Sequence, residues 1–99
     1  MDIIYSNNLF RDLSMRHVIG YQSLSSAKKD LFDTVYNLHL SSMDPATRRE
    51  HTDEHIHQVK WDPLSDCLIV TFKNGNRYKY WENKTWDKVH TPMSKSPLK

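Results

Sequence analysis

Residues 67–81 read CLIVTFKNGNRYKYW, and this stretch decides the fold. Apolar and polar residues alternate on both sides of Lys73-Asn74-Gly75, a pattern typical of two antiparallel strands joined by a tight turn. A two-residue Asn-Gly turn would mix apolar and charged side chains on each face. A three-residue loop with Gly75 in the left-handed conformation separates them, so we predict this second register.

The predicted register pairs Phe72 with Asn76, Val70 with Tyr78 and Leu68 with Tyr80. One face of the hairpin then carries Leu68, Val70, Phe72, Tyr78 and Tyr80. The other face carries Ile69, Thr71, Arg77, Lys79 and Trp81. An earlier strand is predicted to begin at Ile56 and to end at the turn over residues 62–66. Residues 56–82 are therefore predicted to form a three-stranded antiparallel β-meander.

An amphipathic helix is predicted over residues 23–42. Ser25 or Ser26 is a suitable N-cap, and apolar residues follow at helical spacing. The predicted apolar stripe comprises Leu24, Ala27, Leu31, Val35 and Leu38, widened by Phe32 and Tyr36. We expect this stripe to cover one face of the meander, which gives an α+β fold with short flanking helices.

The flanking segments complete one small predicted domain over residues 1–90. In the N-terminal segment, residues 1–22, Ile3–Tyr5 suit a strand, and a short helix that presents Leu9, Phe10 and Leu13 follows and ends before Gly20. Asp44 and Pro45 are predicted to begin a helix over residues 44–55 that is polar all round.

The chain after the meander is predicted to contain one more helix. Glu82 to Thr85 look like a helix cap, so residues 83–90 are predicted as a short helix that carries Trp86 and Val89. Residues 91–99 contain two prolines and no apolar pattern, and they are predicted as a flexible tail.

The composition excludes several classes of protein. With 37% hydrophobic and 26% charged residues, the 99-residue chain suits a globular protein rather than a disordered one. One cysteine, Cys67, excludes an internal disulfide and a multi-cysteine zinc cage, and two glycines exclude a glycine-rich phosphate loop. No apolar run approaches the ~20 residues of a membrane span, and no signal peptide is recognised, so we expect a cytoplasmic protein with no membrane partner.

The net charge of +2 is unevenly distributed. Residues 67–99 carry seven basic and two acidic side chains, whereas acidic side chains are in excess in residues 1–66. A basic C-terminal third suits an anionic partner, but it equally suits solvated lysines that protect the edge of a hairpin from aggregation.

The meander also resembles a known family. The string Val59-x-Trp61-Asp62, followed by Leu68-x-Val70-x-Phe72-x-x-Gly75-x-x-Tyr78-x-Tyr80, is similar to the core of the KTSC domain. This family is a small module seen alone in bacteria and phages and at the end of some lysyl-tRNA synthetases. The resemblance covers about residues 56–90 and implies a meander followed by a helix. It also implies a phage or mobile-element protein, and it carries over no catalytic activity.

A possible metal motif lies just before the meander. Residues 51–55 match H-x-x-E-H, in which His51 and His55 would bind zinc on one helix face and Glu54 would act as the base. Such enzymes are much larger and need a third ligand, and the helix predicted here has no apolar face to bury a site. We therefore predict no cofactor and a solvated helix end, and keep His51, Glu54 and His55 as weak metal candidates. A pH-responsive surface is the middle case.

The most informative candidate site is the basic and aromatic face of the hairpin. It comprises Arg77, Lys79 and Trp81 on the third strand, with Lys84 and Lys88 just beyond. Trp and Arg dominate protein-binding hot spots, so the first hypothesis is a non-enzymatic module that docks on a larger host protein or complex as an inhibitor or modulator. Cations interleaved with aromatic rings also bind single-stranded nucleic acid, so an RNA-binding module is the alternative.

Overall fold

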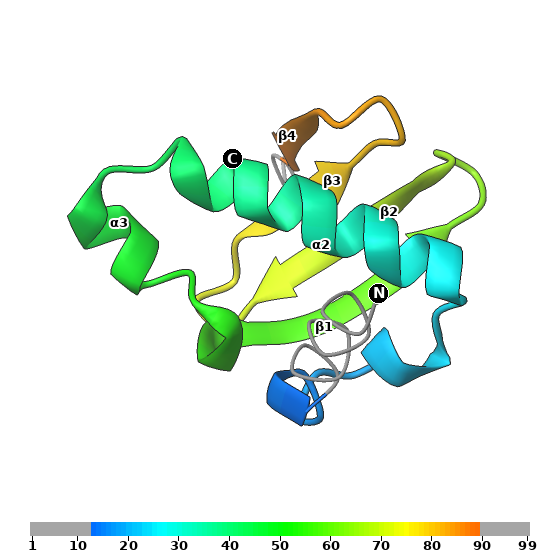
Figure 1. Ribbon diagram of the computed structural model, residues 1–99, viewed down its shortest axis with the longest axis horizontal. Coiled ribbons are helices and arrows are strands. Elements are labelled where there is room, and N and C mark those ends of the chain that lie inside the picture. The colour runs from blue at the N-terminus through cyan, green and yellow to red at the C-terminus, as the bar shows by residue number, and fades with distance from the viewer. Residues whose placement is uncertain (1–12, 90–99) are drawn as a thin grey trace, which may run out of the picture.

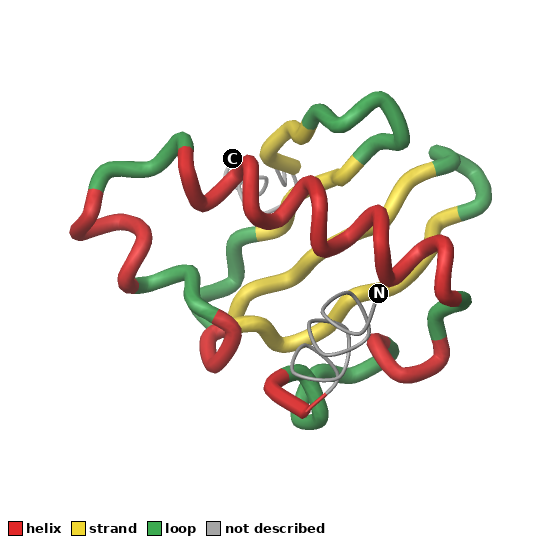
Figure 2. Tube along the Cα trace, viewed as in Figure 1, coloured by secondary structure: helices red, strands yellow, loops and turns green. Residues whose placement is uncertain are grey.

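The computed structural model describes residues 13–89. Its elements are η1 (Tyr21–Ser23), α2 (Ser26–Ser41), α3 (Pro45–Arg49), η2 (Asp53–His55), β1 (Ile56–Asp62), β2 (Cys67–Phe72), β3 (Arg77–Tyr80) and β4 (Trp86–Val89). The strands form one antiparallel sheet in the order β1-β2-β3-β4, and α2 lies across one face of it (Figure 1). Figure 2 shows the same two layers coloured by secondary structure. The strand and helix predicted before Leu13 and the tail predicted over residues 91–99 lie outside the described residues.

The predicted register of the β2–β3 hairpin is confirmed. Leu68 pairs with Tyr80 and Val70 with Tyr78. Gly75 has a φ of 95°, in the left-handed region that favours glycine. Its N–H donates to the Phe72 carbonyl at 2.9 Å, and the Phe72 N–H donates to the Asn76 carbonyl at 2.8 Å. The three-residue loop therefore separates the apolar face from the charged face, as the alternation of residues requires.

The helix predicted over residues 83–90 is wrong, because this segment contains β4. The turn before β4 has the same hydrogen bonds as the turn at Gly75: the Trp81 N–H donates to the Thr85 carbonyl at 2.9 Å, and the Lys84 N–H donates to the Trp81 carbonyl at 3.0 Å. Lys84 occupies the left-handed position with a φ of 70°. The sheet therefore has four strands instead of the predicted three.

The α2 helix is confirmed, but the face that it buries differs from the predicted stripe. The Ser25 side chain accepts a hydrogen bond from the Lys28 N–H at 3.3 Å and so caps the helix, as predicted. The buried residues of α2 are Phe32, Val35, Tyr36 and His39. Ala27 is exposed and Leu38 is 44% exposed, so the centre of the buried face lies about one residue away from the predicted stripe.

The N-terminal segment packs against the outer edge of β1. Ile19 forms a parallel bridge with Gln58, in which the Ile19 N–H donates to the His57 carbonyl at 3.0 Å and the Val59 N–H donates to the Ile19 carbonyl at 2.9 Å. A Cβ on Gly20 would lie 2.3 Å from the Val59 carbonyl oxygen, so only glycine allows this approach. Three side chains of the segment join the core: Met15, Val18 and Tyr21.

The polar helix predicted over residues 44–55 is also wrong in its extent. Pro45 begins α3 as predicted, but the helix ends at Arg49, and a separate 3-10 turn covers Asp53–His55. His51 lies between the two and is only 4% exposed. The sequence of this segment is polar, yet one of its histidine side chains is buried in the core.

Candidate functional site

The sheet has an inner face under α2 and an outer face opposite it. The register places on the outer face the central-strand residues Ile69, Thr71, Arg77 and Lys79, followed by Trp81 just after β3. All five are half-buried. Within residues 13–89, the ring contacts that attach α2 and His51 to the sheet are made to inner-face residues, and Tyr21 of η1 meets the Phe32 ring of α2. The outer face is therefore the unpartnered side of the described sheet.

Lys79 is already engaged by groups of its own chain. Its ammonium lies 3.4 Å from the Ser65 hydroxyl oxygen and 5.8 Å from the centre of the Trp81 ring. In the β3–β4 register it stands opposite Asp87, a residue of opposite charge. Arg77 stands opposite Val89 and has no such acidic partner in the register.

The structure separates the five predicted site residues. Arg77, Lys79 and Trp81 share the outer face, as the register argument predicts. Lys84 lies in the β3–β4 turn, where its ammonium donates to the Glu82 carbonyl at 3.3 Å. Lys88 pairs with Tyr78, which places it on the inner-face side of the edge strand.

Lys60 is an outer-face cation that sequence reasoning missed. It stands opposite Ile69 and is exposed. The register of β1 shifts at a β-bulge between Ile56 and Gln58, so the apolar residues of this strand do not alternate regularly. The residues of β1 that lie on the outer face could therefore not be predicted from the alternation of apolar and polar residues.

His51 lies in the core rather than in a metal site. Its Nδ1 donates to the Thr47 carbonyl at 2.8 Å, and its ring meets the Phe72 ring edge-on at a centroid distance of 4.7 Å. Glu54 is exposed, and His55 Nδ1 lies 3.0 Å from the Thr52 hydroxyl oxygen. Because α3 ends before His51, the H-x-x-E-H residues do not share a helix face. Within residues 13–89 no group of three or more His, Cys, Asp or Glu is placed to hold a metal ion.

His39 is the second buried histidine, and it lies among aromatic rings. Its Nδ1 is 2.8 Å from the Tyr80 hydroxyl oxygen, and its ring centre is 4.4 Å from that of Tyr78 and 5.2 Å from that of Trp86. Burial, followed by repulsion from His51, lowers the pKa of His39 to about 4. We call these side chains the histidine–aromatic cluster: His39, His51, Phe72, Tyr78, Tyr80 and Trp86.

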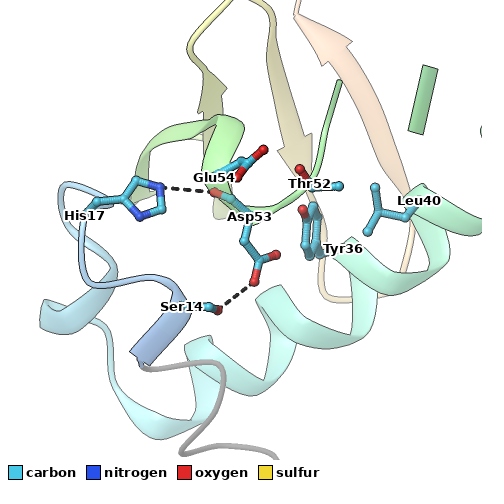
Figure 3. A pocket seen from close by; sticks show the side chains of 7 residues that line it. All are labelled: Ser14, His17, Tyr36, Leu40, Thr52, Asp53 and Glu54. Atoms are coloured by element: carbon cyan, nitrogen blue, oxygen red, sulfur yellow. Dashed lines mark hydrogen bonds between the residues drawn. The ribbon is translucent and has the colours of Figure 1, made fainter. Parts of the chain in front are cut away.

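A cavity of about 510 Å³ opens beside η2 (Figure 3). It is lined by Ser14, His17, Tyr36, Leu40, Thr52, Asp53 and Glu54. The Ser14 hydroxyl donates to Asp53 Oδ2 at 2.6 Å, whereas His17 Nε2 donates to the Asp53 backbone carbonyl at 3.1 Å. A nucleophilic serine needs a hydrogen bond to the histidine that takes its proton. This arrangement directs both groups to Asp53 instead, so it is not a catalytic triad.

Cys67 is not an activated nucleophile. Its side chain is completely buried at the start of β2, and burial raises the pKa of its thiol. A thiol in this state behaves as a small apolar core group.

Comparisons with known proteins leave the family open. A scan against models of protein families finds no match, and searches of curated proteins and of solved structures find no significant similarity. The resemblance to the KTSC domain therefore stays a prediction. No helix within residues 13–89 is long and apolar enough to cross a membrane.

Proposed function

We propose that this protein is a small non-enzymatic binding module that docks on a larger protein through the outer face of its sheet. The observation that carries the proposal is the unpartnered outer face, where the half-buried side chains of Trp81 and Arg77 stand beside Ile69. Trp and Arg supply most of the binding energy in protein interfaces, and a rigid sheet holds them without a large loss of side-chain entropy on binding.

The charges of the outer face favour a partner surface that carries carboxylates. The two central strands contribute Arg77 and Lys79 to this face and no acidic residue. The acidic residues of the outer face, Asp62 and Asp87, lie on its two edge strands, so its centre is positively charged. An acidic group opposite Arg77 would complete a charge-assisted pair while Trp81 and Ile69 cover apolar surface.

A protein partner is favoured over single-stranded RNA by the placement of the lysines. RNA binding needs a continuous row of cations that follows the phosphates. Lys88 points away from the outer face, and the Lys79 ammonium is shared between the Ser65 hydroxyl and the Trp81 ring, with Asp87 opposite it in the register. Arg77 and Lys60 then remain as the unshared outer-face cations of the described sheet, which is a short row for a nucleic-acid strand.

A photo-crosslinking residue at position 71 tests the proposal in the cells that make the protein. Thr71 lies in the middle of the outer face, and Asn37, exposed on α2, is the control position. We expect crosslinking to one protein from position 71 and not from position 37. Crosslinking to RNA, or equal crosslinking from both positions, would contradict the proposal.

Two matched variants then locate the binding energy. Arg77→Ala and Lys88→Ala each remove one positive charge, but from opposite faces of the sheet. Arg77→Ala is expected to weaken binding to the crosslinked protein by about tenfold or more, and Lys88→Ala by less than about twofold. Equal effects of the two variants would indicate a general charge effect and would mean that the outer face is not the binding surface.

A further inference from the structure

The turn between β1 and β2 exposes a leucine to solvent. Leu64 is 96% exposed, whereas the next most exposed large apolar side chain within residues 13–89, Ile19, is 53% exposed. Single apolar residues on a protein surface are ordinary, so exposure alone indicates no function. Leu64 differs from such residues in two ways: its turn is held by hydrogen bonds, and it lies beside the outer face.

The backbone of the turn holds Leu64 in a defined position. The Leu64 N–H donates to Asp62 Oδ1 at 3.2 Å, and the Asp66 N–H donates to the Asp62 carbonyl at 2.8 Å. Pro63 has a fixed φ, and Asp66 adopts the left-handed conformation with a φ of 58°, which aspartate tolerates better than most residues. Because this backbone is ordered before any partner binds, a contact made through Leu64 costs little backbone entropy.

The same turn adjoins the outer face of the sheet. The Lys79 ammonium donates to the Ser65 hydroxyl at 3.4 Å and lies 5.8 Å from the centre of the Trp81 ring. Leu64 directly precedes Ser65, so it lies at the Trp81 end of the outer face. Figure 1 shows the β1–β2 turn and the β3–β4 turn at this same end of the sheet. An exposed apolar side chain therefore continues the outer face beyond the strands.

The charges around Leu64 are opposite to those at the centre of the outer face. Asp62 precedes Leu64 by two residues and the exposed Asp66 follows it by two, whereas Arg77 and Lys79 supply the positive centre. A membrane surface is negatively charged and would repel the two carboxylates, so a lipid partner is disfavoured. A protein pocket that has apolar walls and a basic rim would complement both the leucine and the carboxylates.

We propose that Leu64 is an apolar anchor of the interface and inserts into an apolar pocket of the partner protein, with a lysine or arginine of the partner opposite Asp66. This inference rests on the proposed function, because it extends the same interface from the sheet onto the turn. Burial of a leucine side chain that is almost completely exposed in the free protein corresponds to about tenfold to hundredfold in affinity. The interface then has two anchors, Leu64 on the turn and Trp81 on the sheet.

A short aliphatic diazirine residue at position 64 tests the position of the anchor, because it keeps the shape and the apolar character of leucine. We expect it to capture the same protein as the photo-crosslinking residue at position 71. Capture from position 71 alone would overturn this inference and leave docking through the outer face standing, whereas capture from neither position would overturn both. Capture of lipid from position 64 would also overturn it.

Two matched variants test the energy of the anchor. Leu64→Ala and Leu38→Ala each remove three carbon atoms from an exposed leucine, the first on the turn and the second on α2. Leu64→Ala is expected to melt at the wild-type temperature and to bind the protein captured from position 71 about tenfold or more weakly. Leu38→Ala is expected to weaken binding by less than about twofold. Wild-type affinity of Leu64→Ala, or equal losses in the two variants, would overturn the proposal.

Asp66→Asn tests the basic rim of the pocket, because asparagine removes the charge and also tolerates the left-handed conformation. Its binding is expected to be about threefold or more weaker than wild type at low salt, and the difference is expected to shrink at about 0.5 M salt, where exposed charges are screened. Asp30→Asn on α2, which also removes one exposed carboxylate, is the control and is expected to bind as wild type. Unchanged or tighter binding of Asp66→Asn would overturn the basic rim.

Discussion

The two hairpin turns of the sheet allow the cost of a left-handed backbone conformation to be compared within one protein. They share the same hydrogen bonds, and each has a central asparagine whose Oδ1 accepts from the N–H two residues later, Asn74 from Asn76 and Asn83 from Thr85. The left-handed position is Gly75 in the first turn and Lys84 in the second. The test uses Lys84→Gly in the second turn and the reverse change, Gly75→Lys, in the first.

The magnitude follows from the backbone. A left-handed conformation costs a residue with a Cβ about 1–2 kcal/mol, and glycine loses about 0.5–1 kcal/mol more than other residues through its greater freedom in the unfolded chain. Lys84→Gly is therefore expected to stabilise the protein by about 0.5–1 kcal/mol. A Cβ at Gly75 would meet no atom within 4 Å, so Gly75→Lys carries the conformational cost alone and is expected to destabilise by a similar amount.

Urea denaturation followed by tryptophan fluorescence measures both changes. Trp81 and Trp86 flank the second turn and Trp61 lies on β1, so the signal reports on the whole sheet. The midpoint is expected to rise for Lys84→Gly and to fall for Gly75→Lys, with an unchanged slope. A destabilising Lys84→Gly would refute the reasoning, because it would mean that contacts of the lysine side chain outweigh the backbone strain.

Three further changes test the core and its charges. Gly20→Ala is expected to destabilise by about 2–3 kcal/mol, because its Cβ would lie 2.3 Å from the Val59 carbonyl; a melting temperature equal to wild type would contradict this. Phe32→Ala removes a completely buried ring that is stacked on Tyr36 and Tyr80. The free energy of unfolding is expected to fall by about 3–5 kcal/mol in the same denaturation assay. A fall of less than about 1 kcal/mol would show that the site collapses around the gap. The pKa of His39 is about 4 in the folded state, against 6.5 for an ordinary histidine, so the unfolded state takes the proton first. The contribution of His39 to stability is therefore full above pH 6.5 and falls as the pH drops towards 4. From pH 7 to pH 5 the protonation of His39 is expected to lower the free energy of unfolding by about 2 kcal/mol, and the free energy of unfolding of His39→Phe should fall correspondingly less over the same range.

The parts of the fold that the sequence predicted are those where one residue type has one structural meaning. Gly75 indicated the first turn and its register, because glycine is the residue that adopts a left-handed conformation freely. Ser25 indicated the start of α2 for a similar reason, since its hydroxyl serves the unpaired N–H groups of a helix end.

The parts that the sequence concealed are those where a residue does what its type rarely does. Lys84 adopts a left-handed conformation, so the second turn resembled a helix cap and β4 was missed. His39 and His51 are buried, although histidine in a polar segment more often indicates a solvated surface. As a result, the predicted buried face of α2 differs from the observed one by about one residue, and His51 was considered as a metal ligand. For the candidate site, strand alternation was enough to place Arg77, Lys79 and Trp81 together, but the wrong final helix misplaced Lys88.

The bridge between Ile19 and Gln58 has a consequence for the order of folding. The hairpins close through loops of a few residues, whereas this bridge joins residues 39 positions apart, and a longer loop must lose more entropy before its contacts form. We therefore expect the hairpins to form early and the segment that carries Met15, Val18 and Tyr21 to dock late. The same segment would be the first to detach under mild denaturant, which would open the β1 edge while the rest of the sheet is still paired.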